Sequence, residues 1–406
     1  MAPQATPALR AAWRVFWPTR AAVLLVAVFA ALSFGPSSGG LAAENAVKFD
    51  TPRLTHAVAD PLLAPLARWD AVWYLRVADS GYGESEARAA FFPLYPLLVR
   101  GLAAPFGASP AALLVAAYAI ALSAFLGALA LMHRLVSLEL GRPLAQPTLL
   151  LLAVFPAALY FGAPYAESLF LLLAVGAFYA ARSGRWAWAG AAAAAAAATR
   201  NSGVLLMVPL ALLWWSTRER RPRDAAWLLL APLGLAAFAL YLGLAEGDAL
   251  RFAHAHEAWY RELKLPFVGA WDGLVAAFDG VRQIASNQRE VVYFDKAGGD
   301  PIRVGVLNLI LFGSLAFGVA ACAGVFRRLP PAYGAWVAIS LLLPLSEPVK
   351  PEPLMSMPRF LAVMFPIFMW LAVWCEECGA TDRVVAVFAL GLGLFTAEFA
   401  TWHWIS

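Results

Sequence analysis

Long runs of apolar residues recur along the whole chain and restrict it to folds that bury them in a bilayer. Eleven runs occupy residues 21–34, 111–132, 148–162, 168–181, 187–198, 203–215, 225–245, 304–326, 333–345, 360–374 and 384–399. A helix needs roughly 20 apolar residues to cross a hydrocarbon core of about 30 Å, and the shorter runs require local thinning or snorkelling arginines. The pattern predicts one all-α, polytopic membrane domain over residues 1–406 with about eleven transmembrane helices.

The composition agrees with this interpretation and excludes several functions. Hydrophobic residues make up 62% of the chain and charged residues 14%, against roughly half and a quarter in a typical soluble domain. No basic run is interleaved with aromatic residues, so we expect no nucleic acid partner. Cys375 and Cys378 lack the second pair or nearby histidine that a zinc site needs, and we expect free thiols rather than a metal.

Two long polar regions, residues 35–106 and 246–303, interrupt the apolar runs. The first ends in proline-containing amphipathic segments, which favour interfacial helices within an extracytoplasmic loop. The short basic connections favour the cytoplasmic side, so the N-terminus is expected inside and both long loops outside. The first run, 21–34, resembles a secretory signal, and we expect it to remain as an uncleaved helix. Residues 187–215 fit either two short spans or one kinked helix.

Asp70 lies in the most polar part of the first loop, residues 67–82. Aromatic and carboxylate positions recur there every fourth residue, which predicts a helix ending at Gly81. A carboxylate among aromatic residues is a candidate general base for an attacking hydroxyl. The alternative is an ordinary helix carboxylate paired with Arg68 or Arg76.

Three further charged residues belong to segments that the predicted topology sends to the same face as Asp70. Glu167 lies at a hairpin tip and is a candidate second acid or sugar ligand; alternatively it is a helix N-terminal carboxylate. Arg200 and Arg359 are candidate phosphate ligands, because a guanidinium grips phosphate with paired donors. Interface snorkelling is the alternative for both. Ionisable groups at a membrane boundary usually line a cavity or pair with one another.

Aromatic and histidine residues complete the candidate site. His254 and His256 point to different faces of a helix, so we expect sugar or acceptor contacts, or plain surface, rather than metal binding. Stacking on a sugar and anchoring at the interface are equally open for the aromatic residues near Asp70. These are Trp69, Trp73, Tyr74 and Tyr95.

Several of these motifs resemble the PIG-V family of mannosyltransferases. The matching stretches are Arg68-Trp69-Asp70-Ala71 through Ser80-Gly81-Tyr82, Phe91-Phe92-Pro93-Leu94-Tyr95-Pro96, Pro164-Tyr165-Ala166-Glu167-Ser168-Leu169-Phe170, Thr199-Arg200-Asn201-Ser202-Gly203 and Pro358-Arg359-Phe360. The resemblance implies a GT-C fold, a polyprenyl-phosphate-mannose donor and an acidic residue in the first extracytoplasmic loop, which Asp70 matches. The family commonly has histidine where this chain has Trp73, and no second carboxylate adjoins Asp70.

With Asp70 as the base, a single displacement inverts the anomeric carbon, so a β-linked donor gives an α-mannoside. No aspartate cluster suggests a metal, and we expect neither metal nor cofactor. The expected acceptor is a lipid, polysaccharide or protein hydroxyl on the extracytoplasmic face of the cell's inner (plasma) membrane, where membrane lipids surround the protein. Abundant alanine and arginine with little lysine indicate a bacterial source. The alternatives are a transferase of another lipid-linked sugar, a noncatalytic lipid-holding partner, or a lipid-linked sugar or polyprenyl transporter or flippase. A transporter is expected to carry polar residues near the membrane midplane and often to consist of repeated halves.

Overall fold

The chain is a helical membrane protein in the computed structural model, which describes residues 5–34, 59–259, 261–287, 301–349, 352–403 and 405. All regular elements in these residues are helices, with an isolated β-bridge between Arg261 and Val349. Five helices or helix series have the length and hydropathy of a membrane span. They are α1 (Ala5–Phe34), α6 (Pro110–Glu139), the series Pro222–Ala245, α15 (Pro301–Arg328) and α19 (Thr381–Ala400).

The remaining apolar runs form shorter or broken helices. These are α7 (Arg142–Val154), α8 (Glu167–Arg182), α9 (Trp186–Ala197), α10 (Met207–Ser216) and α16 (Pro331–Leu345). The expected straight helix over 360–374 is broken into α17 (Met357–Val363) and α18 (Pro366–Cys378), bent by 82°. Pro366 explains the break, because proline cannot continue the preceding helical hydrogen bonds. The described residues thus give five spans by length, or six with the bent pair, and the count of eleven stays a prediction.

Helix α1 begins well before the expected residue 21 because its N-terminal half is also packed against the core. Ala8, Ala12 and Val15 are buried on one face of this half. Arg20 is buried as well and donates hydrogen bonds to the carbonyl oxygens of Ala153 (2.8 Å) and Ala158 (2.5 Å). These carbonyls lie where α7 ends and η4 (Pro156–Phe161) begins. Arg20 therefore supplies hydrogen-bond donors to carbonyl oxygens at a helix break, just before the segment that carries Glu167.

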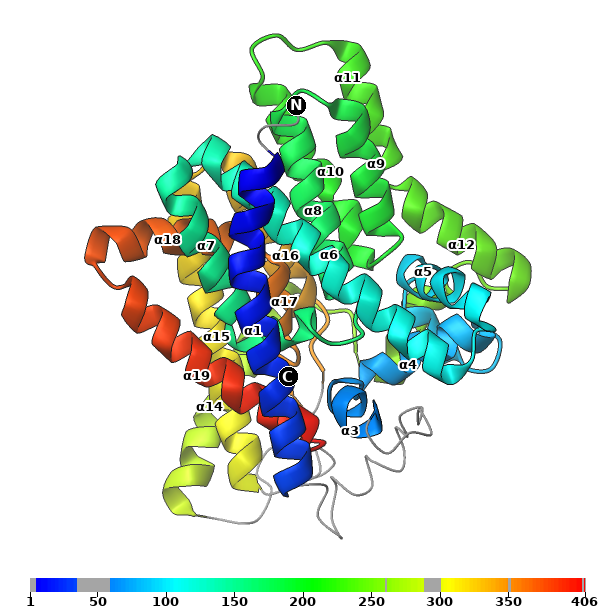
Figure 1. The fold of residues 1–406 in the computed structure, drawn as a ribbon, viewed down its shortest axis with the longest axis vertical. Coiled ribbons are helices and arrows are strands. Elements are labelled where there is room, and N and C mark those ends of the chain that lie inside the picture. Colours follow the sequence, from blue (N-terminus) through cyan, green and yellow to red (C-terminus); the bar gives the residue numbers. More distant parts are fainter. Residues whose placement is uncertain are drawn as a thin grey trace.

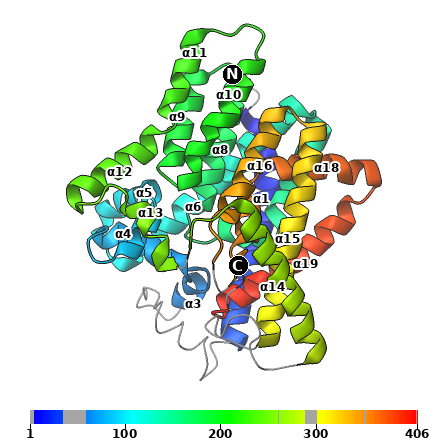
Figure 2. The same cartoon turned by 180° about the vertical axis from the view of Figure 1, so that it is seen from behind.

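The series Pro222–Ala245 consists of α11 (Pro222–Ala226), η6 (Trp227–Leu230) and α12 (Leu233–Ala245). Residues 187–215 form a hairpin, because α9 turns back through η5 (Asn201–Leu206) into α10, and the two helices lie side by side in both views (Figures 1 and 2). Close packing at this turn requires glycine: a Cβ on Gly203 would lie 2.2 Å from the backbone carbon of Ala196. The alanine run therefore serves helix contact.

The first loop folds into short helices. They are α3 (Ala59–Leu63), η1 (Ala64–Leu66), α4 (Asp70–Ser80), η2 (Glu86–Ala90), α5 (Leu94–Ala103) and η3 (Ala104–Phe106). As predicted, α4 ends at Gly81, whose φ of +73° stops the helix. Residues 35–58, the first part of the predicted loop, lie outside the described residues.

The second loop contains α13 (Arg251–His254), η7 (Glu257–Trp259) and α14 (Pro266–Ser286). Helix α14 pairs with α15, where Gly280 and Gly305 let the two backbones approach closely. It exposes a stripe of large apolar side chains that includes Phe267, Trp271 and Phe278. Its three charged residues, Asp272, Asp279 and Arg282, keep α14 out of the set of helices with the composition of a span.

The two ends of the molecule differ in the segments they carry (Figures 1 and 2). The start of α1 and the basic connection between α10 and α11 lie at one end. The end of α1, α3 and the free end of the α14–α15 pair lie toward the other. The basic connection and α3 are thus separated along the long axis.

Candidate active site

Asp70 is the first residue of α4, and the turn before it is strained. Trp69 has φ +55°, a conformation that bulky residues rarely adopt and that costs about 1–3 kcal/mol. The hydroxyl of Tyr165 fixes this turn from a distant segment: it accepts a hydrogen bond from the Asp70 amide (3.1 Å) and donates to the Arg68 carbonyl (2.9 Å). The surrounding structure therefore holds Asp70 in one position.

Glu167 joins two arginines from distant parts of the chain. One carboxylate oxygen, Oε1, accepts hydrogen bonds from Arg200 Nη1 (2.5 Å) and from Arg359 Nε. Arg359 Nη1 also donates to Asp70 Oδ2. We call Asp70, Glu167, Arg200 and Arg359 the ion-pair cluster. The cluster joins four segments of the chain. Asp70 begins α4 and Glu167 begins α8, whereas Arg200 follows the end of α9 and Arg359 lies within α17.

Arg359 is presented by a second unusual turn. Ser356, just before α17, has φ +70°. The Arg359 guanidinium lies 4.8 Å from the ring centroid of Tyr165 and 5.2 Å from that of Tyr160, within the range of cation–π attraction. These rings and the two carboxylates fix the Arg359 guanidinium.

The cluster is shielded from water but balanced in charge. The side chain of Glu167 is 0% exposed, that of Arg359 9%, that of Arg200 15% and that of Asp70 18%. Two carboxylates face two guanidinium groups, so each buried charge has a partner. Removing one partner from such a buried pair typically costs about 3–5 kcal/mol. The sequence-predicted residues Asp70, Glu167, Arg200 and Arg359 are therefore brought together in space.

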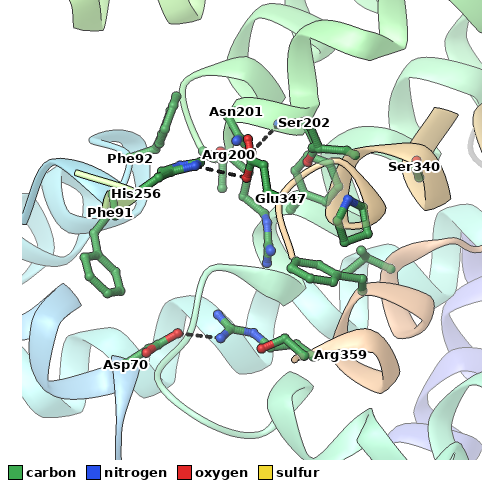
Figure 3. Close-up of a pocket in the computed structure, with 18 of the residues that line it drawn as sticks. Asp70, Phe91, Phe92, Arg200, Asn201, Ser202, His256, Ser340, Glu347 and Arg359 are labelled. Carbon is green, nitrogen blue, oxygen red and sulfur yellow. Dashed lines mark hydrogen bonds and ion pairs between the residues drawn. The ribbon is translucent and has the colours of Figure 1, made fainter. Parts of the chain in front are cut away.

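The cluster borders a cavity of about 170 Å³. Figure 3 shows Asp70 and Arg359 facing each other at one end of this cavity and His256 and Glu347 at the other. Asp70 Oδ2 is paired, whereas Oδ1 accepts no hydrogen bond from the described residues. The cavity therefore combines an available carboxylate oxygen with guanidinium groups.

The opposite wall is built by the second loop, which is fastened to the segment after α16. His256 Nδ1 lies 3.0 Å from Glu347 Oε2, and the Lys264 amide donates to the Ser346 carbonyl (2.7 Å). Burial raises the pKa of Glu347, but the hydrogen bond and charge of His256 and the charge of Arg261 outweigh it, so the pKa lies below its ordinary value. A second cavity of about 620 Å³ shares His256, Arg261 and Glu347 with the first and adjoins it.

The predicted aromatic residues divide between cavity and core. Tyr74 lines the cavity. Trp69 packs edge-on against Trp402, and Tyr95 is fully buried with its hydroxyl donating to a backbone carbonyl, so both belong to the core. Trp73 is stacked behind Phe91, which lines the cavity in its place. Periodicity along the helix did not reveal which aromatic faces the cavity, because that depends on neighbouring elements.

The two predicted histidines also separate. His256 lines the cavity, whereas His254 is exposed and pairs with Asp248, with Nδ1 2.7 Å from Oδ2. His254 is therefore placed at the surface, one of the two locations expected for it. No group of three or more metal-binding side chains occurs in the part of the chain that the structure describes. Cys375 and Cys378 are free thiols.

Sequence reasoning missed three contributors to this site. Tyr165 lay within a recognised motif, but only its contacts reveal that it fixes the Asp70 turn. Arg261 and Glu347 lie in connections without a motif, and both line the cavity. The one available signal was that both connections belong to the face predicted for the site.

Solved structures with a similar arrangement include the oligosaccharyltransferase of Archaeoglobus fulgidus. Its apo form has a TM-score of 0.47 and 14% sequence identity, covering 96% of this chain and 56% of that chain. The form in complex with an inhibitory peptide and a dolichol-phosphate has a TM-score of 0.46 and 13% identity, covering 95% and 55%. The chain thus spans about half the length of these proteins.

Sequence comparison assigns the chain at the level of a family. No curated protein matches it. The family model described as mannosyltransferase (PIG-V) matches residues 13–246, which is more than half of the chain. The match includes Asp70, Glu167 and Arg200, and the ion-pair cluster adds Arg359 from beyond it. The chain therefore belongs to the PIG-V mannosyltransferase family.

Proposed function

We propose that the protein transfers mannose from a polyprenyl-phosphate-mannose donor to an acceptor hydroxyl, with inversion at the anomeric carbon. The observation that carries this proposal is the ion-pair cluster at the edge of the cavity, together with family membership. It supplies a fixed carboxylate next to guanidinium groups, which are the two kinds of group that sugar transfer from a lipid phosphate requires.

Asp70 is the proposed general base. Its Oδ1 has no hydrogen-bond donor among the described residues and takes the proton of the acceptor hydroxyl. The acceptor oxygen then forms a bond to the anomeric carbon while the bond from that carbon to the donor phosphate breaks. One displacement inverts the configuration, so a β-linked donor gives an α-mannoside. The Arg359 ion pair orients Asp70 for this step.

Arg359 and Arg200 are the proposed ligands of the departing phosphate. Their guanidinium groups lie in the cluster and line the cavity. Preorganised positive charge stabilises the phosphate, because its negative charge increases as its bond to the anomeric carbon breaks. We propose that these groups replace a metal ion. Glu167 is fully buried between the arginines, so we propose that it positions them rather than contacting sugar.

Sugar and acceptor contacts are assigned to the other cavity walls. Tyr74 and His256 line the cavity and offer an aromatic face and a polar ring. The adjoining larger cavity, which His256 also lines, is the proposed path of the acceptor. The proposed acceptor is a hydroxyl group of a lipid, a polysaccharide or a protein.

The proposed setting is a GT-C-type arrangement of eleven spans in a bacterial plasma membrane. The short apolar helices α7 to α10 and α16 would add to the spans counted by length. The cavity would open on the extracytoplasmic face, because α4 follows the end of α1 and the basic connection after α10 lies at the opposite end (Figures 1 and 2).

The test is mannosyl transfer by the purified protein in lipid vesicles. Labelled mannose is supplied either on a polyprenyl phosphate or on GDP, with candidate acceptors, and the product is identified by mass spectrometry. We expect transfer from the lipid-linked donor only, undiminished by EDTA. Transfer from GDP-mannose alone would refute the donor assignment, and loss of activity in EDTA would refute the metal-free mechanism.

A further inference from the structure

A third guanidinium group reaches the cavity from the second loop. Arg261 lines the cavity beside the ion-pair cluster, although it lies beyond the region that the family model matches. Its backbone pairs with Val349 in the isolated β-bridge, and its Nη1 donates to the carbonyl oxygen of Glu347 (3.2 Å). These contacts, with the His256–Glu347 pair, hold Arg261 at the cavity wall.

The charge balance of the cluster indicates that a bound phosphate would need a further cation. Asp70 and Glu167 already compensate Arg200 and Arg359, so the cluster adds no net positive charge. Two donor atoms of Arg359, Nε and Nη1, are committed to carboxylates. A phosphodiester brings a further negative charge into a partly dehydrated site, where an unmatched charge is costly.

Arg261 supplies a further cation on the cavity wall, outside the cluster and near the charge of Glu347. The carboxylate of Glu347 is directed to His256, and Arg261 forms no ion pair with any carboxylate in the described part of the chain. The guanidinium carbons of Arg261 and Arg200 lie 5.9 and 5.6 Å from the centroid of the same ring, that of Phe360. Two guanidinium groups thus meet at one ring on the cavity wall.

We propose that Arg261 is a further ligand of the donor phosphate, acting beside Arg200 at the Phe360 ring. This inference rests on the proposed function, because it takes the ligand to be a lipid-linked phosphodiester. The second loop then contributes directly to donor binding, since fastening it to Glu347 positions this cation.

The experiment compares Arg261→Gln with wild type and with the matched control Arg282→Gln in the same loop. Arg282 lies on α14 with its side chain 66% exposed, away from the cavity. Losing a charged hydrogen bond to phosphate should raise the donor KM about 10- to 100-fold. The acceptor KM should not change. The donor KM of Arg261→Lys should lie between those of wild type and Arg261→Gln, because lysine keeps the charge without the paired donors.

Inhibition by farnesyl phosphate, a short lipid phosphate without sugar, provides a second measurement. Its inhibition constant should rise by a similar factor in Arg261→Gln and stay at the wild-type value in Arg282→Gln. An unchanged donor KM and inhibition constant in an active Arg261→Gln protein would overturn the proposal, as would a rise in acceptor KM alone. If Arg261→Gln does not fold, Arg261→Lys decides by the same two constants.

Direct binding of farnesyl phosphate separates this proposal from the proposed function. If the wild-type protein transfers no mannose from the lipid-linked donor, the proposed function fails. Calorimetric titration of wild type and Arg261→Gln with farnesyl phosphate then still tests the phosphate site. Weaker binding by the variant supports Arg261 as a ligand, and equal binding or none in the wild type overturns it.

Discussion

Replacing Asp70 with asparagine is the sharpest test of the proposed chemistry, because the change removes a charge while keeping the shape. The side-chain oxygen of the introduced asparagine would still accept a hydrogen bond from Arg359, and the backbone amide at this position would still donate to Tyr165. The position of the side chain is therefore expected to survive. The variant loses the basicity of the carboxylate and one negative charge of the ion-pair cluster.

The expected magnitudes separate chemistry from stability. A general base contributes typically about 10²–10⁴-fold to the rate, which corresponds to about 2.7–5.4 kcal/mol of transition-state stabilisation. Weakening a charged hydrogen bond at a partly buried site costs about 1–3 kcal/mol of folding free energy, which the fold should tolerate. We therefore expect kcat to fall by that factor in a protein that still folds.

The assay measures mannosyl transfer at saturating donor, with thermal unfolding measured in parallel. The matched control is Asp79→Asn, on the same helix. Asp79 is 59% exposed in its side chain and lies 3.8 Å from Arg100, a surface pair whose loss has little effect. The control should keep wild-type kcat. A folded Asp70→Asn protein with wild-type kcat would show that Asp70 is not the base.

Three other changes test the supporting structure. Glu167→Ala leaves two buried guanidinium groups short of a partner and should lower the unfolding free energy by about 3–5 kcal/mol; unchanged denaturant unfolding would contradict the buried pairing. Tyr165→Phe leaves the Asp70 amide and a carbonyl unsatisfied, which should cost about 1–3 kcal/mol and lower kcat with donor KM unchanged; a wild-type kcat would argue against its positioning role. The pKa of Glu347 is lowered from 4.5, so its carboxylate stabilises the fold above that pH and the contribution is lost as pH falls below it. The Tm difference between wild type and Glu347→Gln should thus shrink below pH 4.5; a constant difference would refute the His256 pairing.

The sequence by itself determined the features that depend on short-range pattern. Apolar runs specify membrane helices because each needs only neighbouring residues to satisfy its backbone. The four-residue period around Asp70 and the glycine at residue 81 predicted α4 and its end correctly. The sorting of basic connections also brought Asp70, Glu167, Arg200 and Arg359 to one face before any contact was known.

Only the tertiary structure decided which of these groups touch. Asp70 and Arg359 are separated by 289 positions and Glu167 and Arg359 by 192, and no periodicity reports a contact at such a distance. Helix packing places Trp69, Trp73 and Tyr95 away from the cavity wall, and contacts between two distant connections place Arg261 on it. The sequence pattern determines the secondary structure of each segment, because that structure depends on neighbouring residues. A buried site shared by distant segments depends on which segments pack together and exclude water, and only the assembled fold determines that.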